Sequence, residues 1–73
     1  MDMLDHQKAV IEHVVNDEKL FIKELKKSLS WLGVDEIRNL YFWLIENYGS
    51  LYADRINFVF KKELSVNFNY FVQ

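Results

Sequence analysis

Two histidines and three aspartates near the N-terminus are the residues whose types could do chemistry. They are His6, His13, Asp2, Asp5 and Asp17. Imidazole and carboxylate groups on one helical face could hold a transition metal. However, a spacing of seven residues places the two imidazoles about 10 Å apart along a helix axis, too far to share one ion. The closer pairs, Asp2 with His6 and His13 with Asp17, supply only two ligands each, so we expect a solvated polar face and no metal site.

Other residue types that support catalysis stand in no catalytic arrangement. The chain has no cysteine nucleophile, and its serines have no triad-like context. The acidic pairs at residues 17–18 and 35–36 stand where helices are expected to begin, and the helix dipole already explains acidic side chains there. The two glycines are isolated, so no phosphate-binding loop is expected. We therefore expect no enzymatic activity, no cofactor and no small-molecule substrate.

Length and composition limit the fold that positions these residues. The 73 residues form one helical domain, 1–73, because chains below roughly 100 residues rarely divide. Without cysteine no disulfide stabilises the fold, and aromatic residues, at 16%, supply the packing instead. No apolar run approaches the ~20 residues that cross a membrane, and the N-terminus does not resemble a secretion signal. We expect a soluble, cytoplasmic protein, and its Lys-, Asn- and Phe-rich usage favours a bacterial or phage gene.

Apolar spacing predicts three amphipathic helices, over residues 2–15, 17–32 and 35–48. Asp17 and Asp35 are suited to cap the second and third helices. Gly33 and Gly49 are suited to the left-handed conformation that often ends a helix. The residues predicted to pack together in the core are Ile11, Leu25, Leu29, Leu40 and Leu44.

The last third of the chain fits two structures. Residues 51–64 have the apolar spacing of a fourth helix capped by Ser50, followed by an extended segment at residues 66–72. The same stretch alternates apolar and polar residues, which could give a β-hairpin over residues 55–72. The sequence KKELS between the two runs lacks the Asn-Gly type of turn, so the helix is favoured. The predicted fold class is all-α, a three- to four-helix bundle with an extended C-terminal segment, and the alternative is α+β with the hairpin.

Four large apolar residues lie off the predicted core stripes. Phe42 falls on the polar side of the third helix, and Trp43 falls on its flank. Leu20 and Trp31 are eleven residues apart and share one side of the second helix. Such side chains must be covered by the chain itself, by a second copy or by a partner. We predict that residues 66–72 cover Leu20 or Trp31, that Phe42 or Trp43 lies in a homodimer contact, and that all four can bind a partner protein.

The alternative function is that of a nucleic-acid-binding regulator with a helix-turn-helix motif, because a short turn containing Gly33 joins the second and third helices. The recognition helix would then carry only one basic residue, Arg38, and would repel phosphates through its acidic residues. The second helix is richer in lysine, with Lys19, Lys23, Lys26 and Lys27. With a net charge of −2 we do not expect nucleic-acid or membrane binding. The sequence favours a small non-enzymatic protein-binding module, a regulator, inhibitor or immunity-type factor.

Overall fold

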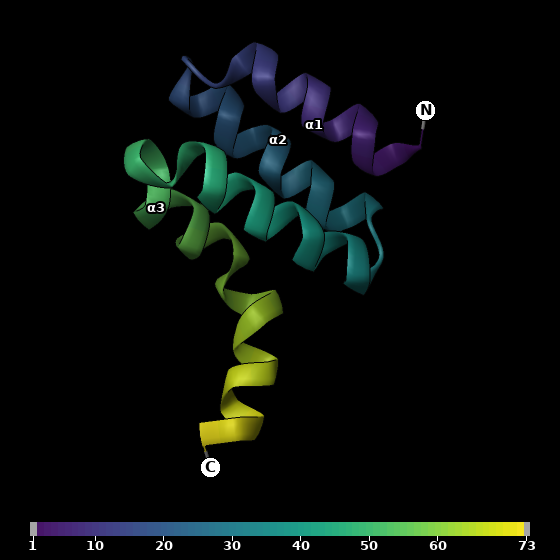
Figure 1. Ribbon diagram of the computed structural model, residues 1–73, viewed down its shortest axis with the longest axis vertical. Helices are drawn as coiled ribbons and strands as arrows, with labels where there is room; N and C mark the ends of the chain where they lie inside the picture. The colour runs from purple at the N-terminus through teal and green to yellow at the C-terminus, as the bar shows by residue number, and fades with distance from the viewer. Residues whose placement is uncertain (1, 73) are drawn as a thin grey trace.

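Helices follow one another along the chain with short turns between them (Figure 1). The computed structural model describes the backbone of residues 2–72, and the side chains of residues 2–61 and of Glu63. Within this part of the chain every regular element is an α-helix, which confirms the predicted all-α class. The three helices are α1, Met3–Val14; α2, Glu18–Trp31; and α3, Val34–Val72.

Aspartate side chains begin the first two helices. The Asp2 Oδ1 atom accepts a hydrogen bond from the Asp5 backbone N–H at 2.8 Å, in front of α1. The Asp17 Oδ1 atom accepts from the Leu20 backbone N–H at 3.3 Å, in front of α2. These bonds satisfy backbone donors that a helix leaves free in its first turn. The predicted cap at Asp17 is confirmed.

The turn between α2 and α3 differs from the predicted one. Leu32 is extended, with φ −95° and ψ 151°, and no glycine of the described backbone has a positive φ. The extended Leu32 already redirects the chain, so Gly33 needs no left-handed conformation. Helix α3 then begins at Val34, and Glu36 Oε1 accepts a hydrogen bond from the Gly33 N–H at 3.0 Å. The predicted cap at Asp35 is wrong, because this carboxylate one residue further along already holds the start of the helix.

A kink at Tyr52 divides α3, where φ is −131° and ψ is 21°. The prediction that Gly49 ends a helix and that Ser50 caps the next one is wrong, since both residues lie inside α3. The break falls at Tyr52 because its side chain is held elsewhere: its ring stacks on Phe21 at 4.5 Å and its hydroxyl donates to the Val15 carbonyl at 2.7 Å. We call residues 34–51 the first part of α3 and residues 53–72 its second part.

The backbone remains helical to Val72, so neither the extended segment predicted at residues 66–72 nor the alternative hairpin over 55–72 is formed. No glycine or proline follows Gly49 to interrupt the helix, and extending an existing helix costs little per residue. The last turns point away from the other helices (Figure 1). The predicted contacts of residues 66–72 with Leu20 or Trp31 involve side chains outside the described residues.

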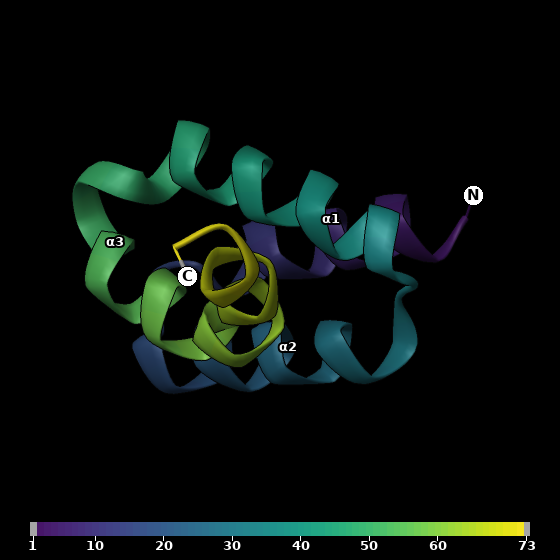
Figure 2. The same ribbon diagram turned by 90° about the horizontal axis from the view of Figure 1, so that it is seen from below.

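The second part of α3 lies between α2 and the first part of α3, as Figure 2 shows. Tyr41 connects the two parts, because its ring lies 5.6 Å from that of Phe60 and its hydroxyl donates to the Asn57 side chain. The predicted core is confirmed: Ile11, Leu25, Leu40 and Leu44 are fully buried and Leu29 packs against them. The other buried apolar residues of the cluster are Phe21, Leu32, Ile37, Ile56 and Phe60.

Two polar side chains are buried between α1 and α2, which the apolar spacing did not indicate. Gln7 is 1% exposed, and its Nε2 atom donates to the Ser28 Oγ atom at 2.8 Å. Ser28 Oγ in turn donates to the Glu24 carbonyl at 2.8 Å. The Gln7 Oε1 atom has no hydrogen-bond partner among the described residues. Helix α1 is therefore positioned partly by a polar contact that is incompletely satisfied.

Candidate functional site

Leu20 and Trp31 stand in one row on α2, away from its buried stripe. Trp31 is 53% exposed and Leu20 is 42% exposed. The Lys27 Nζ atom lies 5.8 Å from the centre of the Trp31 ring, and it also pairs with a Glu24 carboxylate oxygen at 3.3 Å. This geometry is that of a cation over an aromatic face, which supports the ring in an exposed position. We call Leu20 and Trp31, with the ion-paired Glu24 and Lys27 between them, the Trp31 row.

Next to this row, lysines occupy the side of α2 opposite the core. A shallow hollow of about 410 Å³ lies there, lined by Lys19, Ile22, Lys23, Lys26, Lys27 and Ser30. Among the described residues only Lys27 of these four lysines forms an ion pair. We call Lys19, Lys23, Lys26 and Lys27 the basic stripe. The stripe and the Trp31 row are adjacent because residues 23, 27 and 31 follow one another at helical spacing.

Phe42 and Trp43 have different surroundings on α3. Phe42 is 65% exposed and contacts the Tyr41 ring edge-on, with 5.4 Å between ring centres. Trp43 is partly buried against the core, and its ring centre lies 5.6 Å from that of Tyr48. The Lys8 Nζ atom lies over the Trp43 ring, 5.5 Å from its centre. Helix α1 therefore covers Trp43, whereas Phe42 stays open. The four predicted binding residues are divided between two helices, Leu20 and Trp31 on α2 and Phe42 and Trp43 on α3, and no ring contact among the described residues joins Phe42 or Trp43 to Trp31.

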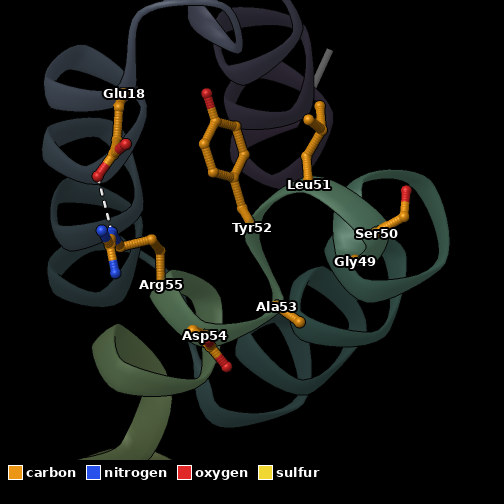
Figure 3. Close-up of a pocket in the computed structure, with 8 residues that line it drawn as sticks. All are labelled: Glu18, Gly49, Ser50, Leu51, Tyr52, Ala53, Asp54 and Arg55. Carbon is orange, nitrogen blue, oxygen red and sulfur yellow. Dashed lines mark hydrogen bonds and ion pairs between the residues drawn. The ribbon is translucent and has the colours of Figure 1, made fainter.

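A second hollow, of about 320 Å³, lies beside the kink in α3 and is drawn in Figure 3. Its lining comes from Glu18 and from residues 49–55. Arg55 Nε donates to Glu18 Oε2 at 2.7 Å across the hollow, while the Tyr52 ring points between the helices (Figure 3). Each charge in the hollow's ion pair is already matched by the other. This arrangement connects α2 to α3. Asp54 also lines the hollow and forms no ion pair among the described residues.

Among the side chains that the structure describes, two have a clearly shifted pKa. Burial, and secondarily the charge of Glu12, raise the pKa of Tyr48. The hydrogen bond that Arg55 donates to Glu18, and then the negative charge of Glu18, raise the pKa of Arg55, which keeps the guanidinium charged. Both shifts follow from helix packing and an ion pair, and neither sets a group up for proton transfer near neutral pH.

His6 and His13 are exposed on α1. Among the described residues no group of three or more histidine or acidic side chains is arranged to hold a metal ion. No helix in the same part of the chain is both long and apolar enough to pass through a membrane.

The sequence did not single out Phe58, which is 75% exposed on the second part of α3. Its place in an apolar–polar alternation suggested a strand, whereas helical spacing puts it opposite the buried Ile56. Helical projection of residues 53–60 would have identified it as an outward aromatic. Val34 and Leu51 are also exposed, next to the two bends of the chain.

Comparisons of this chain with protein-family models, with curated proteins and with solved structures find no match.

Proposed function

We propose that this chain is a small non-enzymatic protein-binding module that acts as a regulator, inhibitor or immunity-type factor by occupying a partner's surface. The observation that carries the proposal is the Trp31 row, an exposed tryptophan and leucine on one side of a packed helix. Tryptophan is enriched among the residues that contribute most to protein–protein binding. A ring that is 53% exposed still has much of its apolar area available for a partner to cover.

Preorganisation supports the same interpretation. On the opposite side of α2, Phe21 and Leu25 are fully buried, and Asp17 caps the helix. The Trp31 row is therefore held on an element that is already ordered. Binding through it costs little conformational entropy compared with binding through a loop.

Phe42 provides a second, separate surface, through which we propose a twofold dimer. Trp43 is covered by α1, so the dimer proposal now depends on Phe42. Sedimentation of the wild type and of Phe42→Glu tests it: a dimer is expected for the former and a monomer for the latter. A wild type that remains monomeric at high micromolar concentration would remove the dimer from the proposal.

The helix-turn-helix alternative receives little support from the packing. The ring centre of Phe21, at the start of α2, lies 6.2 Å from the ring centre of Tyr48, near the end of the first part of α3. The two helices thus run alongside each other over their length, while a helix-turn-helix crosses at about 90–120°. Elution from a heparin column at two salt concentrations distinguishes the two functions, because binding to phosphates depends steeply on salt.

A photo-crosslinking amino acid at position 31, compared with the same group at position 58, tests the main proposal. In extracts of the organism that carries the gene, position 31 should crosslink to a specific protein and position 58 should not. The adduct should disappear when unlabelled wild type competes, and should persist when Trp31→Glu is the competitor. Equal crosslinking at both positions, or none at position 31, would contradict the proposal.

A further inference from the structure

On the exposed side of α2, a stripe of lysines runs beside a row that holds two apolar side chains, Leu20 and Trp31. The basic stripe borders the hollow of about 410 Å³, and the Trp31 row runs beside it. Lys27 belongs to both, since it lines the hollow and lies over the Trp31 ring. A ligand that covers this side of the helix must therefore offer negative charge on one edge and apolar groups on the other.

We propose that this side of α2 binds an acidic amphipathic helix of the partner protein. This inference rests on the proposed function and specifies the chemistry of the partner. Leu20 and Trp31 are separated by about 16 Å along the helix axis, which three turns of a partner helix span. Carboxylates at the i, i+3 and i+4 positions of that helix would meet the basic stripe, and leucine-like side chains would pack on the Trp31 row.

Charge complementarity favours this occupant over a nucleic acid. Glu18 and Glu24 stand on the two sides of α2, so a polyanion wider than one helix would meet carboxylates as well as lysines. Leu20 offers no stacking surface, and nucleic acid would leave its apolar area uncovered. An acidic protein helix places its charges only on the stripe.

The small apolar area of this surface also favours a protein helix over an anionic membrane. Helices that lie on a membrane insert a broad apolar face, commonly with several large residues. Here the apolar side chains are Leu20 and Trp31, with Glu24 paired to Lys27 between them. That surface is wide enough for one row of side chains from another helix.

The test uses the full-length protein and four defined probes. The first is a helical 14-residue peptide with glutamates on one face and leucines on the other, and the second replaces every glutamate with lysine. The third is oligothymidine, and the fourth is a vesicle containing phosphatidylserine. Trp43→Phe leaves Trp31 as the sole tryptophan, so its fluorescence reports binding at the proposed surface.

We expect the glutamate peptide to bind at least tenfold more tightly than the lysine peptide, and to bind more weakly as salt rises. A double variant with Lys23→Glu and Lys26→Glu should bind the glutamate peptide at least tenfold more weakly. The matched control, Arg38→Glu with Lys61→Glu, changes the net charge equally on exposed residues of α3 and should leave the affinity within twofold. Circular-dichroism melts verify that every variant is folded.

Three results would overturn the inference. They are equal affinity for the two peptides, insensitivity to the lysine reversals, and tighter binding of oligothymidine or of vesicles. If position 31 nevertheless crosslinks to a specific protein, the proposed function stands and only the acidic chemistry of the partner is wrong. If crosslinking at position 31 is absent, the proposed function fails as well.

Discussion

The two sides by which α2 contacts its neighbours are built differently. Toward α3, the fully buried Phe21 meets the Tyr48 ring edge-on at 6.2 Å and stacks on Tyr52 at 4.5 Å. Toward α1, the fully buried Ile11 is accompanied by a buried polar contact between Gln7 and Ser28, in which one Gln7 oxygen lacks a partner among the described residues. Aromatic burial stabilises strongly, whereas a buried polar contact contributes little net free energy unless every group is satisfied.

This difference indicates where the stability of a small domain is concentrated. Helices α2 and α3 form the unit that holds most of the fully buried apolar residues, and α1 adds Ile11 alone to that set. We therefore expect α1 to be the helix most easily released. The proposed binding surface lies on α2, in the firmly held unit.

Phe21→Ala should cause the largest loss of stability, because it removes a fully buried ring from the α2–α3 contact. We expect a decrease in the free energy of unfolding of about 3–5 kcal/mol, measured by urea denaturation. The control Phe58→Ala removes a ring that is 75% exposed and should change stability by less than about 0.5 kcal/mol. Equal effects of the two substitutions would show that the α2–α3 contact does not dominate.

Gln7→Leu should stabilise the protein by about 1 kcal/mol, because it removes a buried oxygen without a partner and keeps a similar side-chain volume. Ser28→Ala alone should destabilise by about 1–3 kcal/mol, since it removes the main hydrogen-bond partner of the Gln7 amide. The double substitution should recover most of that loss. A destabilised Gln7→Leu would show that the polar contact holds α1 better than apolar packing would.

Tyr52→Phe keeps the ring that stacks on Phe21 and removes the hydroxyl that donates to the Val15 carbonyl. Losing this bond should cost about 0.5–1.5 kcal/mol in a thermal or chemical melt. Backbone amides near Val15 should exchange faster with solvent, because the end of α1 loses its attachment to α3. Unchanged exchange there would mean that the hydroxyl does not hold the two segments together.

The smallest expected effect is a pH dependence from Tyr48. Its pKa is raised above 10.0 in the folded protein by burial and by Glu12, so folding favours the neutral phenol. The contribution of Tyr48 to stability is full below pH 10 and is lost as the pH rises through the raised pKa. The Tyr48→Phe variant should lose less stability than the wild type between pH 9 and pH 11. Identical slopes for the two proteins would contradict the assignment.

Apolar spacing was sufficient to predict α1, α2, the first part of α3 and the core, because Ile11, Leu25, Leu40 and Leu44 stand at helical intervals. It did not predict that α3 continues as a helix to Val72. The Asp17 cap was also predictable from its type and position. The two glycine positions misled the prediction, since glycine permits a left-handed residue without requiring one. At both bends another residue changes the direction of the chain, Leu32 in the turn and Tyr52 in the kink.

The candidate surface was predictable in part. Trp31, Leu20 and Phe42 lie off the core stripes in sequence and are exposed in the structure. Trp43 has the same sequence signature, yet Lys8 from another helix covers it, and no local pattern contains that contact. The adjacency of the Trp31 row and the basic stripe also depends on which side of α2 packs on α3, which only the complete fold determines.

The attachment at Tyr52 also bears on how fast the chain folds and unfolds. Among the described side-chain hydrogen bonds, those from Tyr52 to Val15 and from Arg55 to Glu18 join residues 37 positions apart, more than any other. Most contacts between helices join α1 to α2 or α2 to α3, which are neighbours along the chain. Helical bundles rich in such local contacts fold in microseconds to milliseconds. Helix pairs can form before these two bonds close. Weakening the bonds should therefore accelerate unfolding and leave the refolding rate nearly unchanged.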